Sequence, residues 1–164
     1  MKKIIWYLVS LLLFRSALPY LYGLKVFLLR LFGAKIGKGV VIKPGVNIKY
    51  PWLLRIGNHS WLGEGAWIDN LALVNIGNNV CISQGASILT GNHNYKKETF
   101  DLMLAEVNIE DGVWVGAKAI VAPGVRLKTH SVLSVASVAV EDTAPYTVYR
   151  GNPALAVRER KIEE

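Results

Sequence analysis

The sequence is poor in the residues that build metal centres and disulfide frameworks. Among 164 residues it has one cysteine, Cys81, and three histidines, at positions 59, 93 and 130. A single cysteine excludes an internal disulfide, so the composition gives no sign of an oxidising compartment. No two histidines have the short spacing that directs two imidazoles at one zinc ion. We therefore expect no metal, and we interpret Cys81 as structural.

Long hydrophobic runs are also missing, although the first 35 residues are strongly apolar. The longest uncharged run, Ile4 to Phe14, has 11 residues, whereas a transmembrane helix needs roughly 20. Basic residues continue through the segment without a small-residue cleavage site, which argues against a signal peptide. Such a pattern favours helices lying in a membrane interface, with peripheral contact only. The alternative is packing over one end of the core or an oligomer contact.

Acidic residues are fewer than basic ones. The sequence has 12 Asp and Glu and 19 Lys and Arg, which gives a net charge of +7. This balance suggests an anionic partner such as nucleic acid, acidic lipid or a phosphorylated small molecule. The basic residues are spread along the chain and form no basic and aromatic cluster, so we discount nucleic acid. A hydrophobic content of 52% excludes a disordered chain.

A six-residue repeat dominates the sequence from Ile36 onward. Fourteen hexads, such as IGKGVV, IGNHSW and VAPGVR, begin with Ile, Val or Leu, and the fifth place is small or valine in 12 of them. A period of six fits neither a helix nor a two-faced strand. It predicts short strands separated by turns, with three hexads to a coil and about five stacked coils, a parallel β-helix. Residues 94–108 interrupt the repeat.

This pattern divides the chain into three predicted parts. Residues 1–35 form an apolar, basic helical segment, residues 36–144 form the β-helix with its loop at 94–108, and residues 145–164 form a C-terminal extension with a short helix. A purely structural solenoid would give the same repeat. Any function must therefore depend on what interrupts it.

Several longer strings resemble one family of enzymes. They are LLRLFGAKIGKGVVIKPGV at 28–46, YPWLLRIG at 50–57, NIGNNVCISQGASILTGNHNY at 75–95, VWVGAKAIVAPGV at 113–125 and YRGNPA at 149–154. Together they are similar to the hexapeptide-repeat acyltransferases, in particular the O-acetyltransferases of colanic-acid-type exopolysaccharide synthesis. The resemblance implies a left-handed β-helix, a homotrimer with active sites between subunits, and acetyl-CoA as the acyl donor.

The resemblance gives His93 the role of general base. It ends the third coil, in GNH, and the interrupting loop follows at once. A neutral imidazole, with an ordinary pKa near 6.5, suits proton removal from a sugar hydroxyl. Taken without the resemblance, the residue could equally be a turn histidine bound to nearby backbone. His59 and His130 both fall at the fourth place of a hexad, a turn position, and are expected to be structural.

The resemblance also suggests residues for the acceptor. Asp69 and Asn70, in WIDN one coil before His93, correspond to positions where relatives hold the sugar. Asn92 occupies a fifth place that is otherwise nearly always small or valine, and Tyr95 offers an aromatic ring to a sugar. The simpler alternative for Asp69 is a corner residue that caps its own turn.

The cofactor wall is expected on the coils after the loop. By resemblance it comprises Gly116 and Ala117 of WVGA, and Val135 and Ala136 of LSVAS, whose small size would let the pantetheine arm approach the main chain. Arg158 is expected to meet a CoA phosphate.

Arg158 lies in PALAVRERKIEE, which we predict to be helical, and it is favoured over Arg160 as the phosphate ligand. The alternative is a solvated helix face, because glutamates alternate with the arginines. Glu141 stands where relatives often have a basic residue, so the nucleotide end of CoA is expected to be held differently here.

The leading hypothesis is therefore an acetyl-CoA-dependent O-acetyltransferase acting on a sugar hydroxyl of a bacterial surface polysaccharide or lipid-linked precursor. The apolar, basic N-terminus supports this hypothesis, because such precursors grow on lipid carriers at the cytoplasmic membrane. We therefore expect a cytoplasmic protein at the inner face of that membrane. Acyl transfer to an amino sugar or another small acceptor is the second reading, and a non-enzymatic β-helix is the third.

Overall fold

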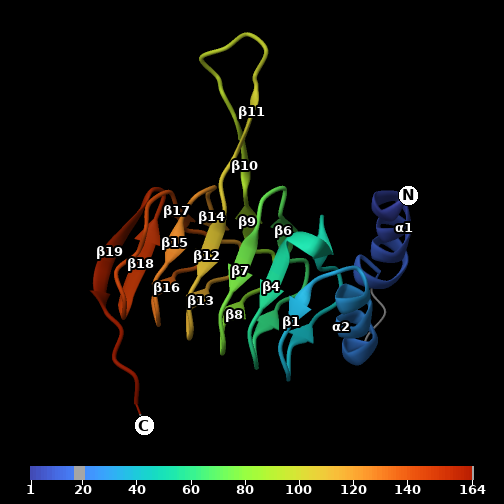
Figure 1. Cartoon of the computed structure of the whole chain (residues 1–164). Coiled ribbons are helices and arrows are strands. Elements are labelled where there is room, and N and C mark those ends of the chain that lie inside the picture. The colour runs from blue at the N-terminus through green and yellow to red at the C-terminus, as the bar shows by residue number, and fades with distance from the viewer. Residues whose placement is uncertain (17–20, 164) are drawn as a thin grey trace.

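The computed structural model describes residues 1–16 and 21–163. The chain winds into a three-faced rod whose faces are parallel β-sheets (Figure 1). Helices cover the end where the chain begins, an antiparallel pair of strands covers the other end, and one hairpin projects from the side of the rod.

Each face of the rod contains one strand from every coil. The first face contains β1 (Lys35–Ile36), β4 (Leu54–Ile56), β7 (Val74–Ile76), β12 (Val107–Ile109) and β15 (Arg126–Leu127). The second contains β2 (Val41–Ile42), β5 (Trp61–Leu62), β8 (Cys81–Ile82), β13 (Trp114–Val115) and β16 (Val132–Leu133), followed by β18 (Thr147–Gly151) and β19 (Ala154–Glu159). The third contains β3 (Asn47–Ile48), β6 (Trp67–Asp69), β9 (Ser87–Leu89), β14 (Ile120–Val121) and β17 (Val138–Ala139).

The leading residue of every hexad points into the rod. Ile36 pairs with Ile56, Ile56 with Ile76, and Ile76 with Ile109 in parallel register. All 14 leading side chains are buried, with at most 9% of their surface exposed. The predicted parallel β-helix is thus confirmed. Its stability derives from columns of aliphatic side chains, each stacked on the coil before and removed from water.

The coil resumes after the interruption two residues earlier than predicted. β12 begins at Val107, which is fully buried and pairs with Val74 of β7. The pairs Leu54-Arg55 and Val74-Asn75, left over between hexads, lengthen β4 and β7 in the same way. The interruption therefore ends before Val107, because that residue already belongs to the stacked core.

The N-terminal segment covers the first coil. It contains α1 (Lys2–Val9), a π-helical continuation (Ser10–Phe14) and α2 (Tyr22–Leu31), while a 3-10 turn (Pro51–Leu53) lies between β3 and β4. Trp6 is buried, and its indole Nε1 donates a hydrogen bond to the Ile48 carbonyl at 2.8 Å. Within the described part of the chain, no helix combines the length and apolarity needed to span a bilayer.

The predicted C-terminal helix is wrong. Residues 147–159 form β18 and β19, an antiparallel pair in which Thr147 lies opposite Glu159. β18 also pairs in parallel with β16, Val132 with Val148, and so begins a sixth layer of the second face. Helix propensity is a weak preference, and here the open hydrogen-bonding edge of β16 outweighs it.

Candidate functional site

The interruption and the last residues of the third coil together form a hairpin that carries His93 away from the rod. β10 (Gly91–His93) pairs antiparallel with β11 (Leu102–Leu104), so that His93 lies opposite Leu102 (Figure 1). The hairpin leaves the rod just after the third face, because Thr90 and Ala105 join at its base through a backbone hydrogen bond of 3.0 Å. The predicted loop therefore has regular structure near the rod.

The His93 ring is oriented by a bond across the hairpin. Its Nδ1 lies 2.7 Å from the carbonyl oxygen of Phe100. A carbonyl oxygen only accepts hydrogen bonds, so Nδ1 carries the proton and donates. In the neutral ring Nε2 is then the nitrogen with the lone pair, available to accept a proton from a ligand. Phe100 was not singled out from the sequence, since its contribution comes from its backbone and not from its side chain.

Polar contacts fix the shape of the hairpin around this histidine. Asn92 Oδ1 accepts from the His93 backbone N–H at 2.8 Å. Near the tip, Lys97 Nζ and Thr99 Oγ1 each donate to the Asp101 carboxylate at 2.6 Å. These two hydrogen bonds lower the pKa of Asp101 below its ordinary value. Asn92 thus positions His93 within the chain, and Tyr95 is 79% exposed on the hairpin.

Asp69 lies on the third face, one coil before the hairpin. Its carboxylate forms an ion pair with Lys49 Nζ at 2.9 Å, and 16% of its side chain is exposed. Buried Thr90 connects this corner with the hairpin base, because its Oγ1 donates to the Asp69 carbonyl oxygen at 2.8 Å. Neither Lys49 nor Thr90 was identified from the sequence, because strand register brings them to Asp69 from neighbouring coils.

Asn70 does not fit the acceptor role expected for it. Its side chain is fully buried. Its Oδ1 accepts from the Tyr50 N–H at 3.0 Å, and its Nδ2 donates to the carbonyls of Tyr50 and Leu53 at 2.6 and 3.1 Å. These bonds hold the corner of the preceding coil, and they leave Asn70 inaccessible to a sugar.

A groove runs along the second face, between its strands and β19. The cavity has a volume of about 1010 Å³. Four of the five residues expected to contact the cofactor line it, namely Gly116, Ala117, Val135 and Arg158. Ala136 does not, and it occupies a turn with φ of +54°. The structure thus brings most of the predicted cofactor residues together on one surface.

The small size of Gly116 is required by the rod itself. A Cβ at this position would approach the Leu133 carbonyl oxygen to 2.7 Å, closer than real Cβ contacts. Ser83 and Gln84 also line the groove, and Ser83 Oγ accepts from the Trp114 indole at 2.9 Å. Close stacking of neighbouring coils therefore explains the glycine without reference to a ligand.

The two C-terminal arginines differ in their contacts. Arg160 Nη1 donates to the carbonyls of Gly112 and His130, at 2.7 and 3.1 Å. Over residues 1–16 and 21–163, the Arg158 guanidinium has no hydrogen bond or ion pair. Arg158 lies in β19 and not in a helix, but it still lines the groove, where its charge is open to an anion.

The other two histidines occupy turns. His59 and His130 have φ of +56° and +57°, and the His130 ring stacks on Tyr146 with centroids 4.8 Å apart. Both are therefore explained by the corners of the coil. The described residues contain no group of three or more His, Cys, Asp or Glu placed to hold a metal ion.

Comparison with known proteins places this rod and its hairpin in a family. No model of a known protein family matches the chain. The colanic acid biosynthesis acetyltransferase WcaF of Escherichia coli K12 is 37% identical over 159 residues, which cover 97% of this chain and 87% of WcaF. The chain belongs to the hexapeptide-repeat acetyltransferases.

Solved structures show the same fold. A hexapeptide-repeat acetyltransferase from Vibrio cholerae superposes with a TM-score of 0.88 at 22% identity, covering 98% of this chain and 92% of that one. The same Vibrio protein in complex with acetyl-CoA superposes with a TM-score of 0.79 at 24% identity, covering 85% and 78% of the two chains. The fold is thus a left-handed parallel β-helix, as predicted.

Proposed function

We propose that the chain transfers an acetyl group from acetyl-CoA to a sugar hydroxyl of a bacterial surface polysaccharide or its lipid-linked precursor. The observation that carries the proposal is the His93 ring on its exposed hairpin, whose Nδ1 bond to the Phe100 carbonyl makes Nε2 the nitrogen with the free lone pair in the neutral imidazole. That is the state a general base needs.

In the proposed reaction, the sugar oxygen forms a bond to the thioester carbonyl carbon while its proton passes to Nε2 of His93. The tetrahedral adduct then breaks its carbon–sulfur bond. The departing CoA sulfur receives the proton from the imidazolium, which restores the neutral base. The bond to Phe100 keeps Nδ1 protonated throughout and stabilises the transient positive charge on the ring.

The groove on the second face supports acetyl-CoA as the donor. Most of its lining residues belong to the coils after the hairpin and to β19, and the free Arg158 guanidinium on its wall suits a phosphate. The Vibrio relative of the same fold has been solved with acetyl-CoA bound. The name of WcaF supports an acceptor from exopolysaccharide synthesis.

We further propose a homotrimer in which the hairpin reaches a neighbouring copy. Phe100, Leu102, Met103 and Leu104 are large apolar side chains exposed on the hairpin. An isolated hairpin of this kind gains stability when its apolar side chains are buried against a surface. A second copy of the chain would cover them and bring His93 to a groove between subunits.

The test replaces His93 and measures CoA release from acetyl-CoA. His93→Ala should lower transfer by about 100- to 10,000-fold while the β-sheet circular dichroism is unchanged. His59→Asn is the matched control, because asparagine also tolerates the positive φ at this turn, and it should retain full activity. Comparable activity of His93→Ala and the control would remove the proposal.

The acceptor class follows from the same assay with paired sugars. Neutral sugars and their 2-amino analogues should be supplied at equal concentration with wild-type protein. Hydroxyl acceptors should release CoA and yield an ester that is cleaved by mild base. Faster release with the amines, giving base-stable amides, would replace the proposal with N-acyl transfer.

A further inference from the structure

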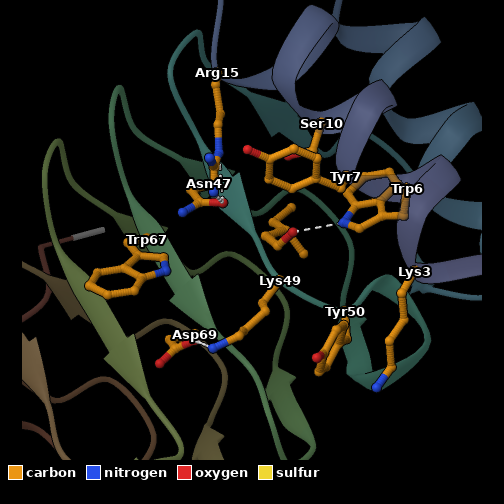
Figure 2. A pocket seen from close by; sticks show the side chains of 11 residues that line it. Lys3, Trp6, Tyr7, Ser10, Arg15, Asn47, Lys49, Tyr50, Trp67 and Asp69 are labelled. Carbon is orange, nitrogen blue, oxygen red and sulfur yellow. Dashed lines mark hydrogen bonds and ion pairs between the residues drawn. The ribbon is translucent and has the colours of Figure 1, made fainter.

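A second pocket lies between the N-terminal helices and the first two coils. It has a volume of about 360 Å³ and is lined by side chains from α1, its π-helical continuation, β3 and β6 (Figure 2). Asp69, the residue expected to hold the acceptor, is on its wall. The pocket therefore shares Asp69 with the expected acceptor residues and places helix residues beside it.

The polar groups of this pocket are held in place before any ligand arrives. Arg15 Nε and Nη2 donate to Asn47 Oδ1 at 3.1 and 2.8 Å, which leaves Nη1 and one Nη2 hydrogen for a ligand. Lys49 is fixed by its 2.9 Å ion pair with Asp69. The hydroxyl of Ser10 is buried on the pocket wall and has no hydrogen-bond partner among the described residues.

The charge of the pocket is not balanced. Its lining has three cations, Lys3, Arg15 and Lys49, and one carboxylate, Asp69, for a net charge of +2. In the part of the chain that the structure describes, Lys49 is the only one of the three with an acidic partner. Arg15 presents a planar guanidinium, which matches the geometry of a carboxylate or phosphate.

Aromatic rings supply the remaining walls. Tyr7 from α1 and Trp67 from β6 flank the space, and both are about half exposed (Figure 2). Tyr50 lies near the rim, with Lys3 Nζ 5.0 Å from its ring centroid. Exposed aromatic faces beside fixed hydrogen-bonding groups are what the apolar and hydroxyl faces of a sugar ring require.

We propose that this pocket is an acidic-sugar subsite, in which Arg15 and Lys49 bind the carboxylate or phosphate of an anionic saccharide acceptor while Tyr7 and Trp67 contact its ring. The assignment deepens the proposed function, on which it rests only for calling this ligand the acceptor. It accounts for an Arg15 guanidinium that lines the pocket without an acidic partner among the described residues. The substrate is then a sugar that carries a negative charge.

The test measures binding of simple probes to the full chain by NMR titration, without acetyl-CoA. The probes are glucose, glucuronate, glucose 1-phosphate and inorganic phosphate. At least one charged sugar should bind about tenfold or more tightly than both glucose and inorganic phosphate, because charge and ring contribute together. The tighter of the two charged sugars identifies the anion. The subsite would be overturned if both charged sugars bound no more tightly than glucose. It would also be overturned if both bound no more tightly than inorganic phosphate.

Variants connect the affinity to the pocket. Arg15→Gln should remove most of the preference for the charged sugar and leave the affinity for glucose unchanged. Lys38→Gln, at an exposed corner of the first coil outside the pocket, is the matched loss of one charge and should bind as wild type does. The proposal fails if Arg15→Gln and Lys38→Gln bind the charged sugar equally well.

Binding and transfer separate this proposal from the proposed function. Charged sugars that bind at Arg15 without ever being acetylated would refute the transfer chemistry and retain the subsite. If only neutral sugars are acetylated and Arg15→Gln is fully active, the acidic-sugar subsite is refuted and the transfer chemistry is retained.

Discussion

Lys25 occupies an environment that a charged side chain disfavours. It lies in α2 with 1% of its surface exposed, where Nζ donates to the Lys43 carbonyl at 3.3 Å and lies 5.7 Å from the Phe14 ring centroid. One hydrogen bond and one aromatic ring replace the water that an ammonium group loses. Burial accordingly lowers the pKa of Lys25.

This burial makes stability depend on pH. Because the pKa in the folded chain is below the unfolded value near 10.5, the unfolded state binds more protons between the two values. The wild type should therefore become more stable as pH rises toward that value. Lys25→Met keeps the apolar stem without the charge, so its melting temperature at pH 7 should equal or exceed that of wild type.

Thermal unfolding at pH 7 and pH 10 checks this expectation. The difference between Lys25→Met and wild type should narrow at the higher pH. Lys25→Ala is the control for packing, and it should be less stable than Lys25→Met because it leaves a cavity. If methionine destabilises the chain as much as alanine does, the cost of the buried charge is negligible.

At the scale of elements, a hydrogen-bond ladder runs along one corner of the rod. The side-chain oxygen of Asn58 accepts a hydrogen bond from the Lys38 backbone N–H at 2.8 Å. The side-chain oxygen of Asn78 accepts one from the Asn58 backbone N–H, also at 2.8 Å. The Asp111 carboxylate accepts one from the Asn78 backbone N–H at 2.7 Å. The Asn78 backbone and side-chain donors lower the pKa of Asp111. Each step joins one coil to the next.

Asp111 should make this corner sensitive to acid. A carboxylate with a lowered pKa stabilises the fold above its unfolded value near 3.8, and this contribution is lost as pH falls through the lower folded value. Asp111→Asn keeps an acceptor for Asn78 but cannot titrate. Its stability, followed by urea unfolding from pH 6 to pH 2.5, should fall less steeply than that of wild type. Parallel curves would show that Asp111 does not contribute.

An element can be predicted from the sequence when the residues that determine its structure lie close to it along the chain. The leading positions of the hexads, such as Ile42 and Val121, could be predicted because a strict period of six specifies both the turn and the inward face. β18 and β19 were missed because their partner is the edge of β16, which no local pattern reveals. The burial of Asn70 depends likewise on the backbone of Tyr50, one coil away.

The candidate site likewise contains some residues that the sequence identified and others that only the structure reveals. The sequence, with its family resemblance, singled out His93, Asp69 and the groove residues. The contacts that orient them come from Phe100, Thr90 and Lys49, and each arises through strand register or hairpin pairing. Pairing of this kind depends on the whole coil, so the supporting residues could not be read from spacing alone.

At the scale of the whole molecule, the N-terminal helices have two different faces. One buries Trp6, Phe14 and Leu29 against the rod. The other exposes large apolar side chains beside basic residues, namely Ile4, Ile5, Leu8, Leu11, Leu12, Leu24, Phe27 and Leu31. An exposed apolar face next to positive charge suits an anionic membrane surface.

Substitution of the exposed face tests membrane contact without disturbing the buried one. A variant with Ile4→Ser, Leu8→Ser and Leu12→Ser should no longer sediment with vesicles of phosphatidylglycerol and phosphatidylcholine, while wild type does. Vesicles of phosphatidylcholine alone should bind wild type more weakly, because the basic residues lose their partner. Retention of the triple variant on anionic vesicles would exclude this face as the contact.

The coverings at the two ends of the rod also determine how long it is. A stack of parallel strands ends in rows of unpaired peptide groups, which invite further chains to add and grow into fibres. Here α1 and α2 lie over the first coil, and β18 turns back into β19, which ends in the exposed charged residues Arg158 and Glu159. These coverings oppose growth at the two ends of the rod. A complete coil could therefore be inserted or removed in the middle, which would lengthen or shorten the rod without changing either covering.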